Sequence, residues 1–131
     1  MPVERTFSVT INPFNAATMY FMPAGSTVSA NEPGLRTEVQ VGGEWVRYRW
    51  VRFRCQAGTA AVQTGQRVVF PQFSEDDTGD NFREGARGIL STSDQQIFLR
   101  NLVAGKRVRW VLYHLGANEG SIAVSGRILF E

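Results

Sequence analysis

The chain has little of the chemistry on which most active sites depend. Its 131 residues include one cysteine, one histidine and a single lysine, Lys106. A lone cysteine excludes an internal disulfide and a zinc site with several cysteines. Cys55 also falls on the apolar face of a predicted strand, which indicates a buried structural thiol. His114 has no nucleophile or carboxylate beside it in the sequence, so we expect a structural histidine and a protein that is not an enzyme.

Long apolar runs and a secretion signal are also missing. No apolar stretch approaches the length needed to cross a membrane, and residues 1–5 lack the basic and apolar regions of a signal peptide. We therefore expect a protein that is made and used in a reducing, soluble compartment, with no membrane partner. The length fits one domain over residues 1–131, which can bury a core without disulfides.

The excess of positive over negative charge is small as well. The net charge is only +2, far below that of most dedicated nucleic-acid-binding domains. All basic residues except Lys106 are arginines, whose planar guanidinium suits phosphates, carboxylates and protein interfaces. Codon usage in a GC-rich genome would give the same skew, so both explanations of the arginine preference stay open.

What the sequence does contain is a series of short apolar runs separated by turn residues. Gly42-Gly43 predicts a hairpin turn, and only residues 81–93 could hold a short helical turn, weakened by two glycines. We expect an all-β fold, an antiparallel eight-stranded β-sandwich that is either a jelly roll or immunoglobulin-like. The eight predicted strands are Phe7–Ile11, Met19–Met22, Leu35–Val41, Trp45–Cys55, Gln66–Phe73, Gln96–Leu99, Arg107–His114 and Ser121–Phe130.

The segment from Trp45 to Cys55 alternates large apolar residues with arginine, and its alternation changes parity once. Val46, Tyr48 and Trp50 share one face of an extended strand, whereas the next apolar set is shifted by one residue. Both sets can point into a core if one residue is inserted, so we expect a β-bulge near residues 50–51. The shifted set is Val51, Phe53 and Cys55.

This arrangement turns several arginines away from the core. Guanidinium groups on one strand repel one another unless carboxylates, phosphates or water face them, so their surface is a candidate anion site, although the pattern does not say which anion. The alternative is that Glu38 and Glu44 on adjacent strands neutralise them. The candidate residues are Arg47, Arg49, Arg52 and Arg54, helped by Arg107 and Arg109 if their strand lies alongside.

The three tryptophans suggest a second class of function on the same architecture. Exposed aromatic rings on one face could form a sugar-binding platform, which would make the chain a carbohydrate-binding β-sandwich module. Trp50 and Trp110 alternate with arginines in predicted strands, so we expect them in the core, whereas Trp45 lies near a turn and can be exposed. A platform needs two or more exposed rings, so this function is the alternative.

From Tyr48 to Asp80 the chain reads Tyr-Arg-x-Val-x-Phe, a polar loop, Thr-Gly-Gln-x-Val-x-Phe and then an acidic loop. This pattern resembles the single jelly-roll coat proteins of small positive-strand RNA plant viruses, such as sobemovirus and tombusvirus shell domains and satellite-virus coats. The glycine-initiated, alternating tail from 118 to 130 is similar to the last strand of those shells. The resemblance covers about half of the chain.

The resemblance implies a capsid subunit that self-assembles into an icosahedral shell around single-stranded RNA, without sequence specificity. Its location would be the virion, with assembly in the host cytoplasm. Two features depart from the family: only six residues precede the first predicted strand, where a basic arm is common, and the chain is short. If the resemblance holds, arginines on the folded body neutralise the RNA, or an arm was removed, or packaging is weak. The resemblance also implies that the arginine surface described above faces either the RNA phosphates or a neighbouring subunit.

The acidic loop from Glu75 to Asn81 gathers four carboxylates and an amide, the oxygen ligands that calcium prefers. Its spacing does not match an EF-hand, so a complete site within one chain is not indicated. Asp77 and Asp80 are similar to the Asp-x-x-Asp half-site with which sobemovirus-like coats hold calcium between subunits, with Asp76 and Asn81 as helpers. The alternative is an ordinary solvated turn.

Overall fold

The computed structural model describes residues 2–22, 32–61, 65–76, 78, 80–102 and 106–131, and within them the chain is all β. No helix occurs in these ranges, and so none that could cross a membrane. The strands are β1 (Val3–Ile11), β2 (Tyr20–Met22), β3 (Leu35–Arg36), β4 (Glu38–Val41), β5 (Glu44–Arg47), β6 (Trp50–Ala57), β7 (Arg67–Ser74), β8 (Arg83–Glu84), β9 (Gly88–Ile89), β10 (Gln95–Asn101), β11 (Arg107–His114) and β12 (Ile122–Phe130).

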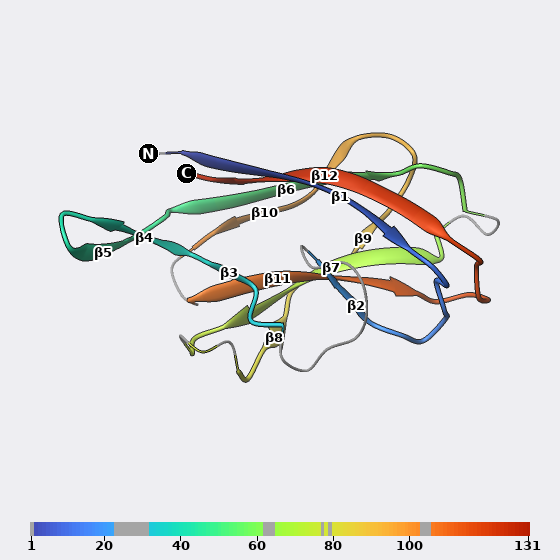
Figure 1. The fold of residues 1–131 in the computed structure, drawn as a ribbon, viewed down its shortest axis with the longest axis horizontal. Coiled ribbons are helices and arrows are strands. Elements are labelled where there is room, and N and C mark those ends of the chain that lie inside the picture. The colour runs from blue at the N-terminus through green and yellow to red at the C-terminus, as the bar shows by residue number, and fades with distance from the viewer. Residues whose placement is uncertain (1, 23–31, 62–64, 77, 79, 103–105) are drawn as a thin grey trace.

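The strands form two layers, as Figure 1 shows, and the predicted antiparallel β-sandwich is confirmed. One layer is a four-stranded sheet in the order β1-β12-β6-β10. The other is a six-stranded sheet in the order β2-β11-β7-β8, in which β3 also pairs with β11 and β9 with β7. The remaining strands, β4 and β5, pair with each other in a separate hairpin.

The core lies between the two layers because alternate residues of the central strands point inward. Val51, Phe53 and Cys55 of β6 are fully buried, as the alternation predicted. Across the interface, Trp110 of β11 stacks on Phe53 with their ring centroids 4.5 Å apart. Burying each large apolar side chain contributes about 1.5–3 kcal/mol, so these strands hold the layers together.

All eight predicted strands are present, and the higher strand number has two sources. The segments 35–41 and 45–55 are each divided into two strands, and β8 and β9 lie within residues 81–93. The segment 81–93, where the sequence allowed at most a short helical turn, contains no helix, and part of it pairs as short strands against β7. Two-residue strands carry no period, so the sequence pattern did not reveal them.

The prediction of a β-bulge near Trp50 is wrong. The chain breaks between β5 and β6 instead, and the break accommodates the change of parity. At the break Tyr48 is buried, its backbone N–H donates to the Thr37 carbonyl over 3.0 Å, and its ring stacks on Phe130. Val46 and Trp50, expected in the core with Tyr48, are 48% and 38% exposed. A register shift occurs elsewhere, between Gln96 and Phe98 of β10.

The predicted turn at Gly42-Gly43 is confirmed. Both glycines have positive φ angles, +58° and +85°, as a two-residue hairpin turn of the mirror-image type requires. The β4–β5 hairpin that they close extends from one end of the sandwich in Figure 1.

Candidate functional site

Three arginines lie together on the outer face of the four-stranded sheet. Arg52 and Arg54 belong to β6, and the pairing of β6 with β12 places Arg127 directly opposite Arg54. With Glu4 and Leu129 they line a hollow of about 210 Å³, called here the arginine hollow. Like charges directly opposite one another destabilise a sheet unless anions neutralise them.

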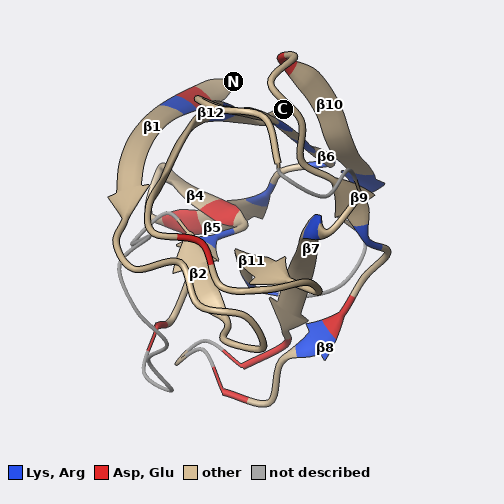
Figure 2. Ribbon diagram, turned by 90° about the vertical axis from the view of Figure 1, so that its right-hand side faces the viewer, with Lys and Arg blue, Asp and Glu red and all other residues tan. Residues whose placement is uncertain are grey.

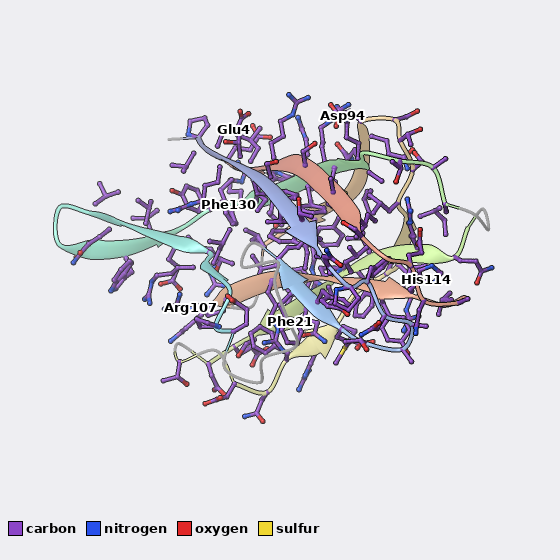
Figure 3. All side chains as sticks on the ribbon, turned by 45° about the vertical axis from the view of Figure 1, so that its right-hand side comes forward. Glu4, Phe21, Asp94, Arg107, His114 and Phe130 are labelled. Carbon is purple, nitrogen blue, oxygen red and sulfur yellow. The ribbon has the colours of Figure 1, made fainter. Side chains whose placement is uncertain are left out.

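Carboxylates supply part of this neutralisation. Asp94 approaches both Arg54 (3.6 Å) and Arg127 (3.3 Å), and Glu131 lies 3.3 Å from Arg52. In Figure 3, Glu4 and Asp94 both lie on this outer side of the sandwich. Such partly exposed ion pairs each contribute at most ~1 kcal/mol. The Nε atoms of Arg52 and Arg54 are buried without a hydrogen-bond partner among the described residues.

Arg47 and Arg49 do not belong to this surface. Arg47 lies in the hairpin, where its guanidinium is 3.1 Å from the carboxylate of Glu38. This is the neutralising contact that the sequence offered as the alternative. Arg49 lies at the break between β5 and β6, is exposed, and donates its backbone N–H to the Glu131 carbonyl over 2.8 Å.

Arg107 and Arg109 lie in the opposite layer, because β11 belongs to the six-stranded sheet. Arg109 is buried between the rings of Phe21 and Phe82, 3.9 and 3.6 Å from its guanidinium carbon, and donates to the Gln72 side chain over 2.7 Å. This burial lowers the pKa of Arg109. Figure 2 shows basic segments in both layers, for example in β6 and β8. Of the four arginines expected on one surface, only Arg52 and Arg54 share it, and the condition under which Arg107 and Arg109 would join them is not met.

Arg107 donates to the Gly34 carbonyl over 3.3 Å, and Figure 3 places it on the side of the six-stranded sheet, far from Glu4 and Asp94. Arg109 also donates to the Glu32 carbonyl over 2.6 Å, so both β11 arginines contact the connection that enters β3. Their strand does not lie alongside β6, so they cannot help its arginines.

The acidic loop is described only in part, since Asp77 lies outside the described residues. Asn81 donates its side-chain N–H to the Asp76 carboxylate over 3.0 Å, and the Thr78 hydroxyl donates to the Asp80 carboxylate over 3.1 Å. Within the described ranges, no three histidine, cysteine or acidic side chains gather closely enough to hold a metal ion.

A buried cluster of polar side chains, formed by Arg67, His114 and Glu119, lies at the end of the sandwich opposite the hairpin. No sequence pattern indicated it. The Arg67 guanidinium, 1% exposed, donates two hydrogen bonds to the Glu119 carboxylate over 2.5 and 2.9 Å. It donates a third to the Thr59 carbonyl over 2.5 Å. The hydrogen bond from Arg67 is the main cause that holds the pKa of Glu119 below its ordinary value.

His114 completes the cluster. Its Nδ1 accepts a hydrogen bond from the Gly116 N–H over 2.8 Å, so Nε2 carries the proton and lies 2.7 Å from the Glu119 carboxylate. The imidazole packs on Phe14, whose backbone exchanges two hydrogen bonds with that of Glu119. The cluster ties the loops after β1 and β11 together at the end marked by His114 in Figure 3.

The remaining singled-out residues divide between core and surface. Cys55 is fully buried, and this burial raises the pKa of its thiol to about 12, which fits a structural residue. Trp110 is buried as expected and Trp45 is 52% exposed. Trp50 was expected in the core but is 38% exposed. The two exposed rings stand on different sheets, and the Arg36 guanidinium covers one face of Trp45 at 3.6 Å.

No protein-family model matches the chain, and no curated protein sequence matches it.

Proposed function

We propose that this chain is a jelly-roll coat subunit that self-assembles into a shell around single-stranded RNA, in a virion assembled in the host cytoplasm. The observation that carries the proposal is the order of the strands. Eight strands form the continuous hydrogen-bonded paths of the two large sheets. Counted along the chain, the first of these pairs with the eighth, the second with the seventh, the third with the sixth and the fourth with the fifth. The eight are β1, β2, β6, β7, β8, β10, β11 and β12.

This order is what results when one long hairpin of four strand pairs is rolled into two layers, and it supports a jelly roll. Jelly rolls build viral coats, but they also build lectins and cupins, so the fold alone does not choose a function. The coat-like motifs between Tyr48 and Asp80 favour a shell. So does the apolar hairpin, which carries three of the seven exposed large apolar residues in the described ranges: Val41, Trp45 and Val46.

RNA as the content of the shell rests on the sequence resemblance. Arginine contacts to phosphate release counterions, so such binding weakens steeply with salt and shows little sequence preference. The arginine hollow is the described surface on which several guanidiniums converge, although Asp94 and Glu131 already neutralise part of its charge.

The test is the size of the purified protein, measured by light scattering after gel filtration and by electron microscopy, with and without RNA and calcium. We expect closed particles of uniform diameter under at least one of these conditions. A monomer at high concentration under all of them would overturn the proposal. Strong binding to a glycan array that Trp45→Ala abolishes and Trp110→Phe leaves intact would then favour the carbohydrate-binding alternative.

A further inference from the structure

The β4–β5 hairpin is held firmly at its base. The carboxylate of Glu38 accepts hydrogen bonds from Arg36 of β3 over 3.4 Å and from Arg47 over 3.1 Å. Between β3 and β4, Thr37 is fully buried and donates its backbone N–H to the Lys106 carbonyl over 2.9 Å. The hairpin is therefore a fixed projection whose tip is presented at a set position.

One face of this projection is apolar. The pairing of Val39 with Val46 and of Val41 with Glu44 places these four side chains on the same face, because residues alternate along each strand. Val39 packs against the main core at the base, whereas Val41 and Val46 are 56% and 48% exposed. We call Val41, Glu44 and Val46 the valine face. A two-stranded sheet with an open apolar face gains stability from a partner that covers it.

A complementary surface lies on the outer face of the four-stranded sheet. There Arg52 of the central strand β6 lies opposite Leu129 of β12 on one side and Leu99 of β10 on the other. Trp50, two residues before Arg52 in β6, is on the same face. Leu99 is 44% exposed and Trp50 38%. We call these four residues the Arg52 patch. The patch shares Arg52 and Leu129 with the arginine hollow, and its apolar side chains surround the Arg52 cation. The valine face instead places the Glu44 anion between two apolar side chains.

We propose that the valine face of one copy docks on the Arg52 patch of a second copy. The Glu44 carboxylate enters the arginine hollow toward Arg52, and Val41 and Val46 cover Leu99 and Trp50. Charge complementarity selects this pairing over contact between two valine faces, which would oppose two Glu44 carboxylates without a cation. The contact joins two different surfaces, so it leaves a free hairpin and a free patch and propagates into a ring or shell.

The inference rests on the proposed self-assembly and names the contact that drives it. Two four-residue strands cover roughly 130 Å², at about 3.3 Å per residue and 4.8 Å between strands. A stable pair of proteins buries roughly 800 Å² on each partner. One docked hairpin is thus too small to hold a dimer, and it stabilises an assembly in which many copies of the contact act together.

Charge exchange between the two surfaces tests the proposal. We expect Glu44→Arg and Arg52→Glu each to raise the protein concentration needed for assembly by roughly tenfold or more, because each opposes like charges in the contact. Mixing the two variants should restore assembly, since every junction between unlike variants again joins an arginine to a glutamate. The double variant should assemble by itself for the same reason.

Glu84→Arg is the matched control, because Glu84 is exposed and lies in β8 of the six-stranded sheet, outside both surfaces; it should assemble like the parent. If the parent assembles and Glu44→Arg assembles equally well, the contact is wrong while the proposed function stands. If the parent never assembles, both fail. Failure of the mixture and of the double variant, while circular dichroism shows both variants folded, would also overturn the contact. So would an Arg52→Glu variant that assembles normally but no longer retains RNA.

Discussion

At the scale of single residues, the ion pair between Arg67 and Glu119 is the contact whose loss we expect to cost the most folding free energy. Two hydrogen bonds join the side chains, and Arg67 is 1% exposed. Desolvating two ions costs several kcal/mol, which their attraction offsets only while both are present. Removing one partner therefore leaves a buried, unpaired charge.

We expect Glu119→Gln to lower the free energy of unfolding by about 3 kcal/mol at neutral pH, because it leaves the Arg67 guanidinium without its counter-ion. The measurement is urea denaturation followed by tryptophan fluorescence. Glu84→Gln is the control, since Glu84 is exposed and receives one 3.4 Å hydrogen bond from Gln72. It should change stability by no more than about 0.5 kcal/mol. Equal effects of the two substitutions would contradict this account of the cluster.

The same pair predicts how stability depends on acid. The folded pKa of Glu119 lies below its ordinary value of 4.5, so its carboxylate stabilises the folded state fully above that pH. This contribution falls as the pH drops through 4.5 toward the folded pKa, because protonation favours the unfolded chain. The difference in unfolding free energy between parent and Glu119→Gln should therefore shrink on acidification. A difference that stays constant down to the acid transition would exclude Glu119 as its source.

At the scale of elements, the strands were predictable where a periodic pattern met clear turn residues. Residues Arg107–His114 were predicted with the bounds that β11 has, and the Gly42-Gly43 turn was predicted from its two glycines. The division between β5 and β6 was not, because a bulge and a break solve the same parity change equally well. Which occurs depends on Tyr48 packing against Phe130, a contact with no local signature.

The candidate site was predictable only in part, for the same reason. Arg52 and Arg54 alternate with buried residues, so the pattern gave their face correctly. It could not show that Arg127 lies opposite Arg54, or that Arg109 belongs to the other sheet, because pairing between distant strands is set by topology. Arg67 and Glu119 are 52 residues apart, and no sequence pattern indicates that they meet.

Strand β12 contains a glycine whose role is set by its neighbours. Gly126 pairs with Phe7 of β1 and Cys55 of β6, and a Cβ added there would lie 2.7 Å from the Phe7 ring and 2.8 Å from the Cys55 Cβ. We expect Gly126→Ala to destabilise the fold by about 1–3 kcal/mol through overpacking. Gly120→Ala should be nearly neutral, since nothing lies within 4 Å of its added Cβ. Thermal unfolding by circular dichroism compares the two, and matching midpoints would refute the overpacking.

At the scale of the whole molecule, the outer faces of the two layers differ. The six-stranded sheet buries β7 on both sides, and Phe21, Val68, Phe70 and Val111 form a second apolar cluster there. Arg87 lies over the Phe70 ring at 4.7 Å and adds to that layer. The four-stranded sheet instead presents the arginine hollow and the Arg52 patch to solvent. The exposed arginines and apolar side chains therefore lie on the four-stranded sheet, and the exposed valines and Glu44 lie on the hairpin.

Calcium belongs to this whole-molecule scale, because the Asp-x-x-Asp pattern of the acidic loop is similar to a half-site that a second subunit completes. Carboxylates gathered at a subunit boundary repel one another when no cation lies between them. If Asp77 and Asp80 are half of such a site, a chelator at mildly alkaline pH should swell or loosen the parent assembly, and added calcium should reverse the change. Protonation in mild acid should partly replace the ion, since it removes the same repulsion.

The double variant Asp77→Asn with Asp80→Asn tests this prediction, with assembly size followed by light scattering during titration with chelator and calcium. Removing both charges also removes the repulsion, so the variant's assembly should no longer respond to either reagent. Glu75→Gln, in the same loop, is the matched control and should respond like the parent, because it leaves the Asp-x-x-Asp pair intact. Equal responses of double variant and parent would mean that these carboxylates bind no ion between subunits and that the loop is a solvated turn.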